Sequence, residues 1–113
     1  VFHKKGAYVR PHKHLNKLES FQIIKGDVTL ILFNNNGKPI KKIEMGDYSS
    51  GKVFYYKLQK SYFHTQLINK DTIFKEVTNG PFKIQNTLKA NWSPKEYQIQ
   101  KIIDYNKKLK RAF

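Results

Sequence analysis

The chain has 113 residues, a formal net charge of +14 and no cysteine. This length suits one domain with a single core, and 39% hydrophobic with 14% aromatic residues exclude a disordered chain. The lack of cysteine excludes disulfides and thiolate ligands, and no apolar run reaches the roughly 18–20 residues of a membrane span. We therefore expect a cytoplasmic globular domain with no membrane partner.

Glycine, asparagine and proline interrupt the chain at intervals typical of many short strands joined by turns. The predicted strands cover residues 7–14, 18–25, 28–33, 40–44, 53–58, 62–68 and 72–77. Asn36-Gly37 predicts a hairpin turn, because glycine adopts positive φ without steric cost. Successive antiparallel strands of this kind favour an all-β jelly roll or closed barrel.

The last segment changes to a helical period. Ser93, Pro94 and Glu96 have the spacing of a capping box with proline at the first helical position. The apolar residues that follow recur at helical spacing, at Ile99, Ile102, Ile103 and Leu109. We expect a barrel over residues 1–92 and one amphipathic C-terminal helix over 93–113 that covers a barrel end, with Trp92 as a packing anchor.

Residues 6–26 contain a spacing that is typical of a metal site. His12 and His14 lie two apart, so an extended strand would place both imidazoles on one face, and Glu19 follows after a short turn. Gly6 and Gly26 stand at the two ends of the segment. Two imidazoles and one carboxylate suit one divalent ion in a nitrogen and oxygen environment, which favours Fe, Mn, Zn, Ni or Co.

This spacing resembles the first conserved motif of the cupin superfamily. That resemblance implies a small double-stranded β-helix, or jelly-roll, barrel with a metal in its mouth. It also implies a fourth ligand on a later strand, for which His64 is the candidate. Many cupins have a Pro-x-Gly turn ahead of this ligand, where this chain has Gln59-Lys60-Ser61. The alternative is that His64 is an ordinary polar residue at a strand edge.

The chain is also similar to WbuC-type cupin fold metalloproteins along nearly its whole length. The matching segments are residues 6–14, Gly26 with 29–33, Asn36-Gly37, 74–77 leading into 80–82, and 90–96. That family is associated with bacterial surface-polysaccharide (O-antigen) gene clusters. The resemblance therefore implies a metalloprotein of polysaccharide metabolism.

Strand alternation predicts further residues that line the pocket. Tyr8 and Arg10 would share the face of His12 and His14, and Gln66 would share the face of His64, so we expect these three side chains to bind substrate. Arg10 suits a carboxylate or phosphate, although an ion pair at a strand end is an equal alternative. Glu76 is the candidate general base, or a partner that orients a ligand histidine; an exposed glutamate is the other interpretation.

The high positive charge first suggests a nucleic-acid partner. Twenty of the twenty-two cations are lysines, however, and they are scattered along the chain without a known nucleic-acid motif. We therefore expect no specific nucleic-acid partner, and instead an attraction for anionic small molecules such as sugar nucleotides. A homodimer is an expectation by analogy with other cupins.

Three functions remain open at this stage. The first is a metal-dependent enzyme or binding protein that acts on a carbohydrate or sugar nucleotide, with an isomerase or epimerase as the enzyme class considered. The second is a non-haem metal-dependent oxygenase. The third is a metal-stabilised binding module without turnover, since the same ligands serve all three.

Overall fold

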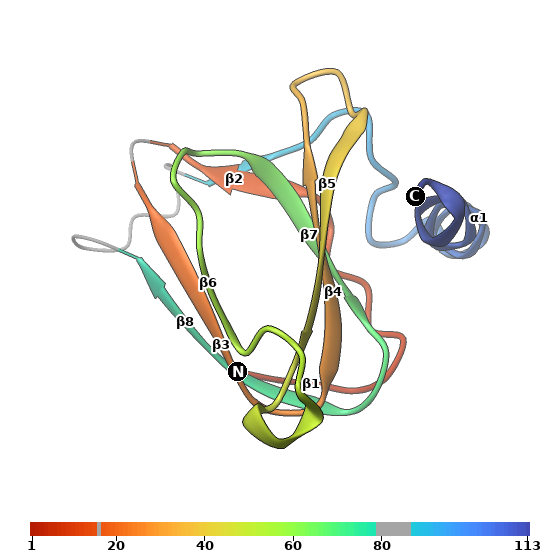
Figure 1. Cartoon of the computed structure of the whole chain (residues 1–113). Coiled ribbons are helices and arrows are strands. Elements are labelled where there is room, and N and C mark those ends of the chain that lie inside the picture. Colours follow the sequence, from red (N-terminus) through yellow and green to blue (C-terminus); the bar gives the residue numbers. More distant parts are fainter. Residues whose placement is uncertain (16, 79–86) are drawn as a thin grey trace.

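The short strands form two antiparallel sheets that face each other (Figure 1). The computed structural model describes residues 1–15, 17–78 and 87–113. One sheet has the order β1 (Phe2–His3), β8 (Thr72–Thr78), β3 (Glu19–Lys25) and β6 (Tyr55–Lys57). The other has the order β5 (Pro39–Gly46), β4 (Asp27–Phe33), β7 (Phe63–Ile68), β2 (His12–His14) and β9 (Thr87–Lys89). A short 3-10 turn covers Tyr48–Ser50, and helix α1 (Ile99–Arg111) follows the strands, so the predicted all-β architecture with one C-terminal helix is confirmed.

The core lies between the two sheets and follows from the alternation of side chains along each strand. On β4, Val28, Leu30 and Leu32 point into this space and are at most 3% exposed. They pack against residues of the facing sheet, which include Phe21, Ile23 and Phe74. The space between the sheets is therefore filled with apolar side chains up to the histidines, where Leu32 lies opposite His64 and Phe21 packs against its ring.

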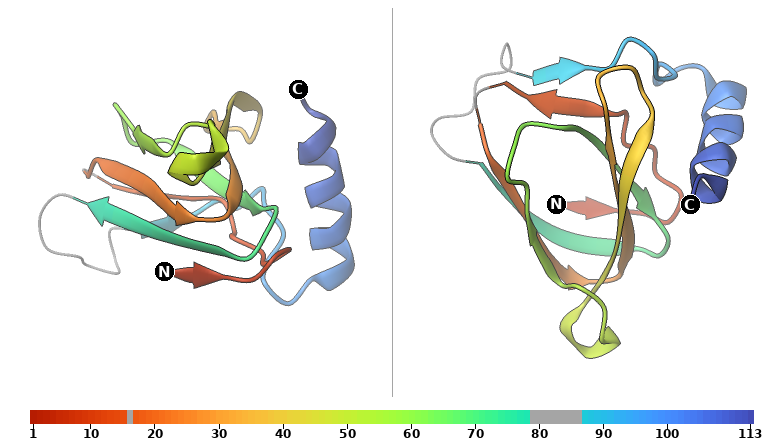
Figure 2. Two further views of the ribbon diagram at one scale, coloured as in Figure 1. Left: turned by 60° about the horizontal axis from the view of Figure 1, so that its bottom comes forward. Right: turned by 45° about the horizontal axis from the view of Figure 1, so that its top comes forward.

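Helix α1 packs against the outer face of the five-stranded sheet (Figure 2). The outward residues of β4 and β7 meet Leu109 of the helix in a second apolar cluster, which includes Ile31, Phe33, Phe63 and Leu67. Strands β4 and β7 are thus buried on both faces, which explains the apolar run 30–33 of β4. The helix covers a sheet face and not a barrel end, which corrects the sequence-based expectation.

The helix begins at Ile99, six residues after the predicted start at Ser93. The Ser93 hydroxyl donates to the carbonyl of Ala90 and accepts from the Arg10 side chain, so it does not cap the helix. The amide of Lys95 donates to the Gln98 side chain, which closes a separate turn before the helix. Tertiary contacts therefore outcompete the capping box.

The N-terminal segment also departs from the prediction, because only His12–His14 of the expected strand 7–14 is a strand. Strands β1 and β9 were not predicted; each has no more than three residues, too few for a periodic pattern. The segment 80–82, part of the family resemblance, lies outside the described residues. Among the described residues, no helix combines the length and apolarity needed to cross a bilayer.

Candidate metal centre

Three imidazoles come together on two neighbouring strands. Strand β2 pairs with β7 so that His12 lies directly opposite His64, and the two ring centroids are 4.6 Å apart. His14 lies two residues further along β2, and its ring centroid is 5.3 Å from that of His12. The register between the two strands therefore gathers the three histidines at one end of the barrel.

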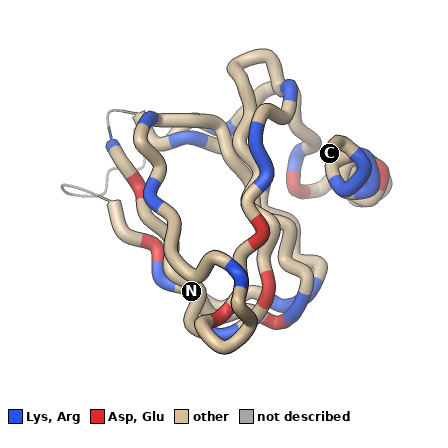
Figure 3. The backbone as a smooth tube through the Cα atoms, viewed as in Figure 1, with Lys and Arg blue, Asp and Glu red and all other residues tan. Residues whose placement is uncertain are grey.

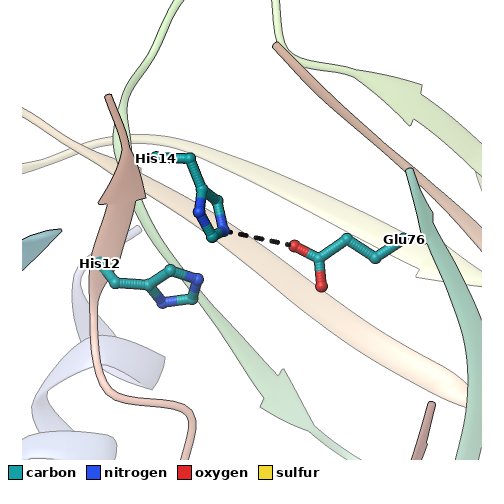
Figure 4. Close-up of side chains that lie close together, drawn as sticks. All are labelled: His12, His14 and Glu76. Atoms are coloured by element: carbon teal, nitrogen blue, oxygen red, sulfur yellow. Dashed lines mark ion pairs between the residues drawn. The ribbon is translucent and has the colours of Figure 1, made fainter. Parts of the chain in front are cut away.

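Two carboxylates reach the histidines from the facing sheet. Glu19 opens β3, and its Oε1 and Oε2 atoms lie 3.5 Å from the Nε2 atoms of His14 and His64, respectively. Glu76 on the adjacent strand β8 places Oε1 3.9 Å from Nε2 of His14, as Figure 4 shows. Candidate ligand atoms of His12, His14 and Glu76 lie within 4.8 Å of one another, as do those of Glu19, His64 and Glu76. The structure thus brings together the four predicted ligands and adds Glu76.

The orientation of the rings suits metal binding. Nδ1 of His12 lies 2.9 Å from the carbonyl oxygen of Arg10, and Nδ1 of His64 lies 2.9 Å from that of Tyr62. A carbonyl only accepts hydrogen bonds, so each Nδ1 carries the proton and each Nε2 keeps its lone pair. Nδ1 of His14 similarly pairs with the Thr87 hydroxyl at 2.9 Å. Such hydrogen bonds are the usual means of orienting metal-binding histidines.

Two buried atoms at the centre of the cluster lack a hydrogen-bond partner. They are Nε2 of His64 and Oε2 of Glu19, in side chains that are 1% and 3% exposed, and no group in the described part of the chain donates to either. Both atoms are acceptors in the tautomer set by Tyr62, yet they face each other across 3.5 Å. A cation or a shared proton between them would satisfy both. The donor set therefore fits a divalent metal ion.

Burial controls the protonation of the cluster in the metal-free protein. Burial, with a smaller effect of His64, lowers the pKa of His12 to about 4, and burial also lowers the pKa values of His14 and His64. Burial raises the pKa of Glu19. The pKa of Glu76 rises to about 7, first through burial and then through the adjacent Glu19 carboxylate. The imidazoles are thus neutral at pH 7, as metal binding requires.

The predicted substrate-binding residues separate into two groups. The Tyr8 hydroxyl donates to the carbonyl of Pro94, and the Arg10 side chain contacts Ser93, the carbonyl of Ala90 and Glu96. Both side chains thus point to the segment before α1 and away from the histidines, because residues 7–11 do not form a strand and the two-residue alternation fails there. The ion-pair alternative for Arg10 is realised with Glu96 at 3.4 Å.

Gln66 lies where the alternation places it. It is 6% exposed and two residues from His64 on β7, so the two side chains share the inner face of the strand. Its role in substrate binding stays a prediction. Thr87 was missed by sequence reasoning, because only the pairing of β9 with β2 brings it opposite His14.

Comparison with known proteins places this geometry in a wider context. Residues 1–45 match a family described as a domain of unknown function (DUF6016). Three similar solved structures are of the capsular polysaccharide assembling protein CapF: two are from Staphylococcus aureus, and the third contains the inhibitor 3-isopropenyl-tropolone. They have TM-scores of 0.60, 0.59 and 0.57, identities of 19%, 20% and 20%, and cover 78%, 77% and 76% of this chain. The fold is that of a cupin.

The chain spans only about a quarter of the length of CapF, 25–26% in the three structures. At this level of identity the likeness shows the fold alone, and the chemistry has to be argued from the residues of the site. No curated protein matches the sequence.

Proposed function

We propose that this cupin domain holds one divalent transition metal through His12, His14, Glu19 and His64, and uses it to bind or transform a carbohydrate in bacterial surface-polysaccharide assembly. The observation that carries the metal proposal is the buried pair of acceptor atoms, Nε2 of His64 and Oε2 of Glu19, that face each other without a donor. Three nitrogen donors and one oxygen donor suit Fe, Mn, Zn, Ni or Co.

The bound metal would supply Lewis acidity toward a carbonyl or hydroxyl oxygen of the substrate. The chain itself supplies the orientation of the ligands, because each histidine ring is held through its Nδ1 atom. It also excludes bulk water from the deep side of the centre, where Phe21 packs edge-on against His64 at 5.5 Å.

Glu76 is the group best placed to move a proton. Its side chain is 28% exposed, whereas that of Glu19 is 3% exposed, so a ligand that enters from solvent can reach Glu76. A solvent-accessible carboxylate beside the bound substrate suits a general base. An isomerase or epimerase step, in which a proton is removed next to a carbonyl, is the reaction that this arrangement favours.

The polysaccharide context rests on two kinds of likeness. The structural neighbours are named as capsular polysaccharide assembling proteins. The sequence resemblance to WbuC-type cupins narrows the proposal to O-antigen metabolism in the cytoplasm. The net charge of +14 supports an anionic substrate, such as a sugar nucleotide.

Elemental analysis tests the metal centre. We expect about one equivalent of a first-row divalent ion in the purified protein and its loss in the double variant His12→Ala/His14→Ala. His3→Ala is the matched control, because His3 stacks on Phe74 at 5.6 Å and is not among the candidate ligands. Wild-type protein that cannot be loaded with any of these ions would contradict the metal site.

A ligand screen then tests the substrate class. We expect sugar nucleotides, sugar acids or phosphosugars to raise the melting temperature of the metal-loaded protein. Glu76→Gln should keep the metal but lose turnover of whichever sugar substrate is found. If oxygen is consumed instead when Fe²⁺ and substrate are present, the oxygenase alternative replaces the isomerase.

3-Isopropenyl-tropolone, the inhibitor in one CapF structure, offers a further probe. Its two adjacent oxygens are ligands of the kind that such ions accept. We expect its absorption spectrum to shift with the loaded wild-type protein and to stay unchanged with His12→Ala/His14→Ala. An unchanged spectrum with loaded wild-type protein would indicate that the metal has no exchangeable coordination positions.

A further inference from the structure

A hollow of about 450 Å³ lies between α1 and the segment that precedes it. We call it the Trp92 groove; the residues of its lining that matter here are Trp92, Lys95, Lys101, Asp104, Tyr105 and Lys108. Helix α1 covers the outer face of the five-stranded sheet (Figures 1 and 2), whereas His64 on the same sheet contacts Glu19 and Phe21 of the facing sheet, on the inner side. The groove is thus separate from the metal centre.

The groove carries a net positive charge, because its lining holds three lysines, Lys95, Lys101 and Lys108, against the single carboxylate of Asp104. Lys101 and Lys108 lie seven residues apart, so they share one side of the helix about 10 Å apart along its axis. Among the described residues, no ion pair involves Lys95, Lys101 or Lys108. Figure 3 shows other Lys and Arg positions along the same helix. An anionic ligand would therefore be attracted here.

The aromatic side of the groove is held in place. The Trp92 ring contacts Phe33 and Phe63 with centroid distances of 4.9 and 5.5 Å, and its Nε1 donates to the carbonyl of Asn35 at 3.0 Å. The rest of this half-buried ring lines the groove beside Tyr105. A fixed aromatic surface of this kind suits the apolar C–H face of a sugar ring.

We propose that the Trp92 groove binds an acidic carbohydrate, independently of the metal. A sugar ring packs on Trp92, its carboxylate or phosphate group meets Lys101 and Lys108, and a hydroxyl donates to Asp104. Asp104 disfavours a nucleic acid, because its carboxylate would repel a continuous phosphate backbone. An acidic sugar can instead turn a neutral hydroxyl toward Asp104 and its charged group toward the lysines. The unpaired lysines disfavour a second copy of this chain, because like charges would face each other.

The fluorescence of Trp92 reports binding directly, because it is the only tryptophan of the chain. The probe is trigalacturonic acid, with the neutral maltotriose and a short oligothymidylate as comparisons. We expect saturable change with trigalacturonic acid that weakens as salt is added, and a tenfold or greater preference over maltotriose. No change with trigalacturonic acid, or tighter binding of the oligothymidylate, would overturn the proposal.

A pair of charge reversals locates the site. Lys101→Glu/Lys108→Glu should weaken binding of trigalacturonic acid at least tenfold. Lys25→Glu/Lys75→Glu changes the net charge by the same amount at two exposed positions, one on β3 and one on β8, and should change the affinity less than twofold. Circular dichroism establishes that both variants are folded. Equal losses in the two variants would indicate attraction by net charge alone and would refute the groove.

Discussion

Thr87→Val is the sharpest test of how the metal centre is built. The Thr87 hydroxyl is a side-chain partner of one of the three Nδ1 atoms, that of His14, whereas His12 and His64 pair with backbone carbonyls that no substitution removes. Valine keeps the shape of threonine but lacks the hydroxyl. It would leave Nδ1 of His14 without this partner at a residue that is 8% exposed.

The size of the effect follows from the role of such hydrogen bonds at metal sites in general. Removing a group that orients a metal-binding histidine costs about 10–100-fold in metal affinity, which corresponds to about 1.4–2.7 kcal/mol. We therefore expect Thr87→Val to weaken metal binding by about one to two orders of magnitude.

Competition against a chromophoric chelator measures this affinity, and the visible spectrum of the Co²⁺-loaded protein reports ligand geometry. Thr87→Ser keeps the hydroxyl and should stay within about threefold of the wild type. A Thr87→Val protein with wild-type affinity and an unchanged Co²⁺ spectrum would refute the role of this hydrogen bond. If Thr87 only supported the fold, Thr87→Val and Thr87→Ser would both lower the melting temperature, and the two variants would bind the metal with similar affinity.

Three further predictions concern the fold and its pH dependence. Gly37→Ala should destabilise the protein by about 1–3 kcal/mol in denaturant unfolding, because Gly37 has φ 91° and an added Cβ would lie 2.7 Å from the Trp92 ring; an unchanged midpoint would contradict this packing. In the metal-free protein, the pKa of His12 falls from an unfolded value of about 6.5 to about 4 in the folded state, so the folded state binds fewer protons in this range. The contribution of His12 to stability should thus be fully present above pH 6.5 and decline by up to about 3 kcal/mol as the pH falls toward 4, while the raised pKa of Glu76 acts in the opposite direction; the test is therefore the difference between the wild type and His12→Gln, which should shrink as the pH falls toward 4, and a difference that does not change with pH would contradict the assignment. Ser93→Ala should lower the melting temperature through loss of the Arg10 contact while the helical circular dichroism signal stays the same, because Ser93 does not cap the helix; a large loss of helix signal would restore the capping-box interpretation.

The sequence was most informative where a local pattern sets the structure. The two-residue spacing of His12 and His14 places both rings on one face of a strand, and the apolar run of β4 marks a central strand. The shared face of His12 and His14 and the all-β class could therefore be predicted from local patterns, whereas His64 was proposed from the family resemblance. The helix itself was also predicted, because its apolar residues recur with the helical period.

Only the tertiary structure decided how these parts meet. The register of β2 on β7 sets His12 opposite His64, the facing sheet brings Glu76 to the same point, and β9 supplies Thr87. Tertiary hydrogen bonds also draw the Arg10 side chain to Ser93, which delays the start of the helix. Side-chain periodicity depends on neighbours in the chain and can be read from them, whereas register and long-range hydrogen bonds depend on partners that are far apart in the sequence and become neighbours only on folding.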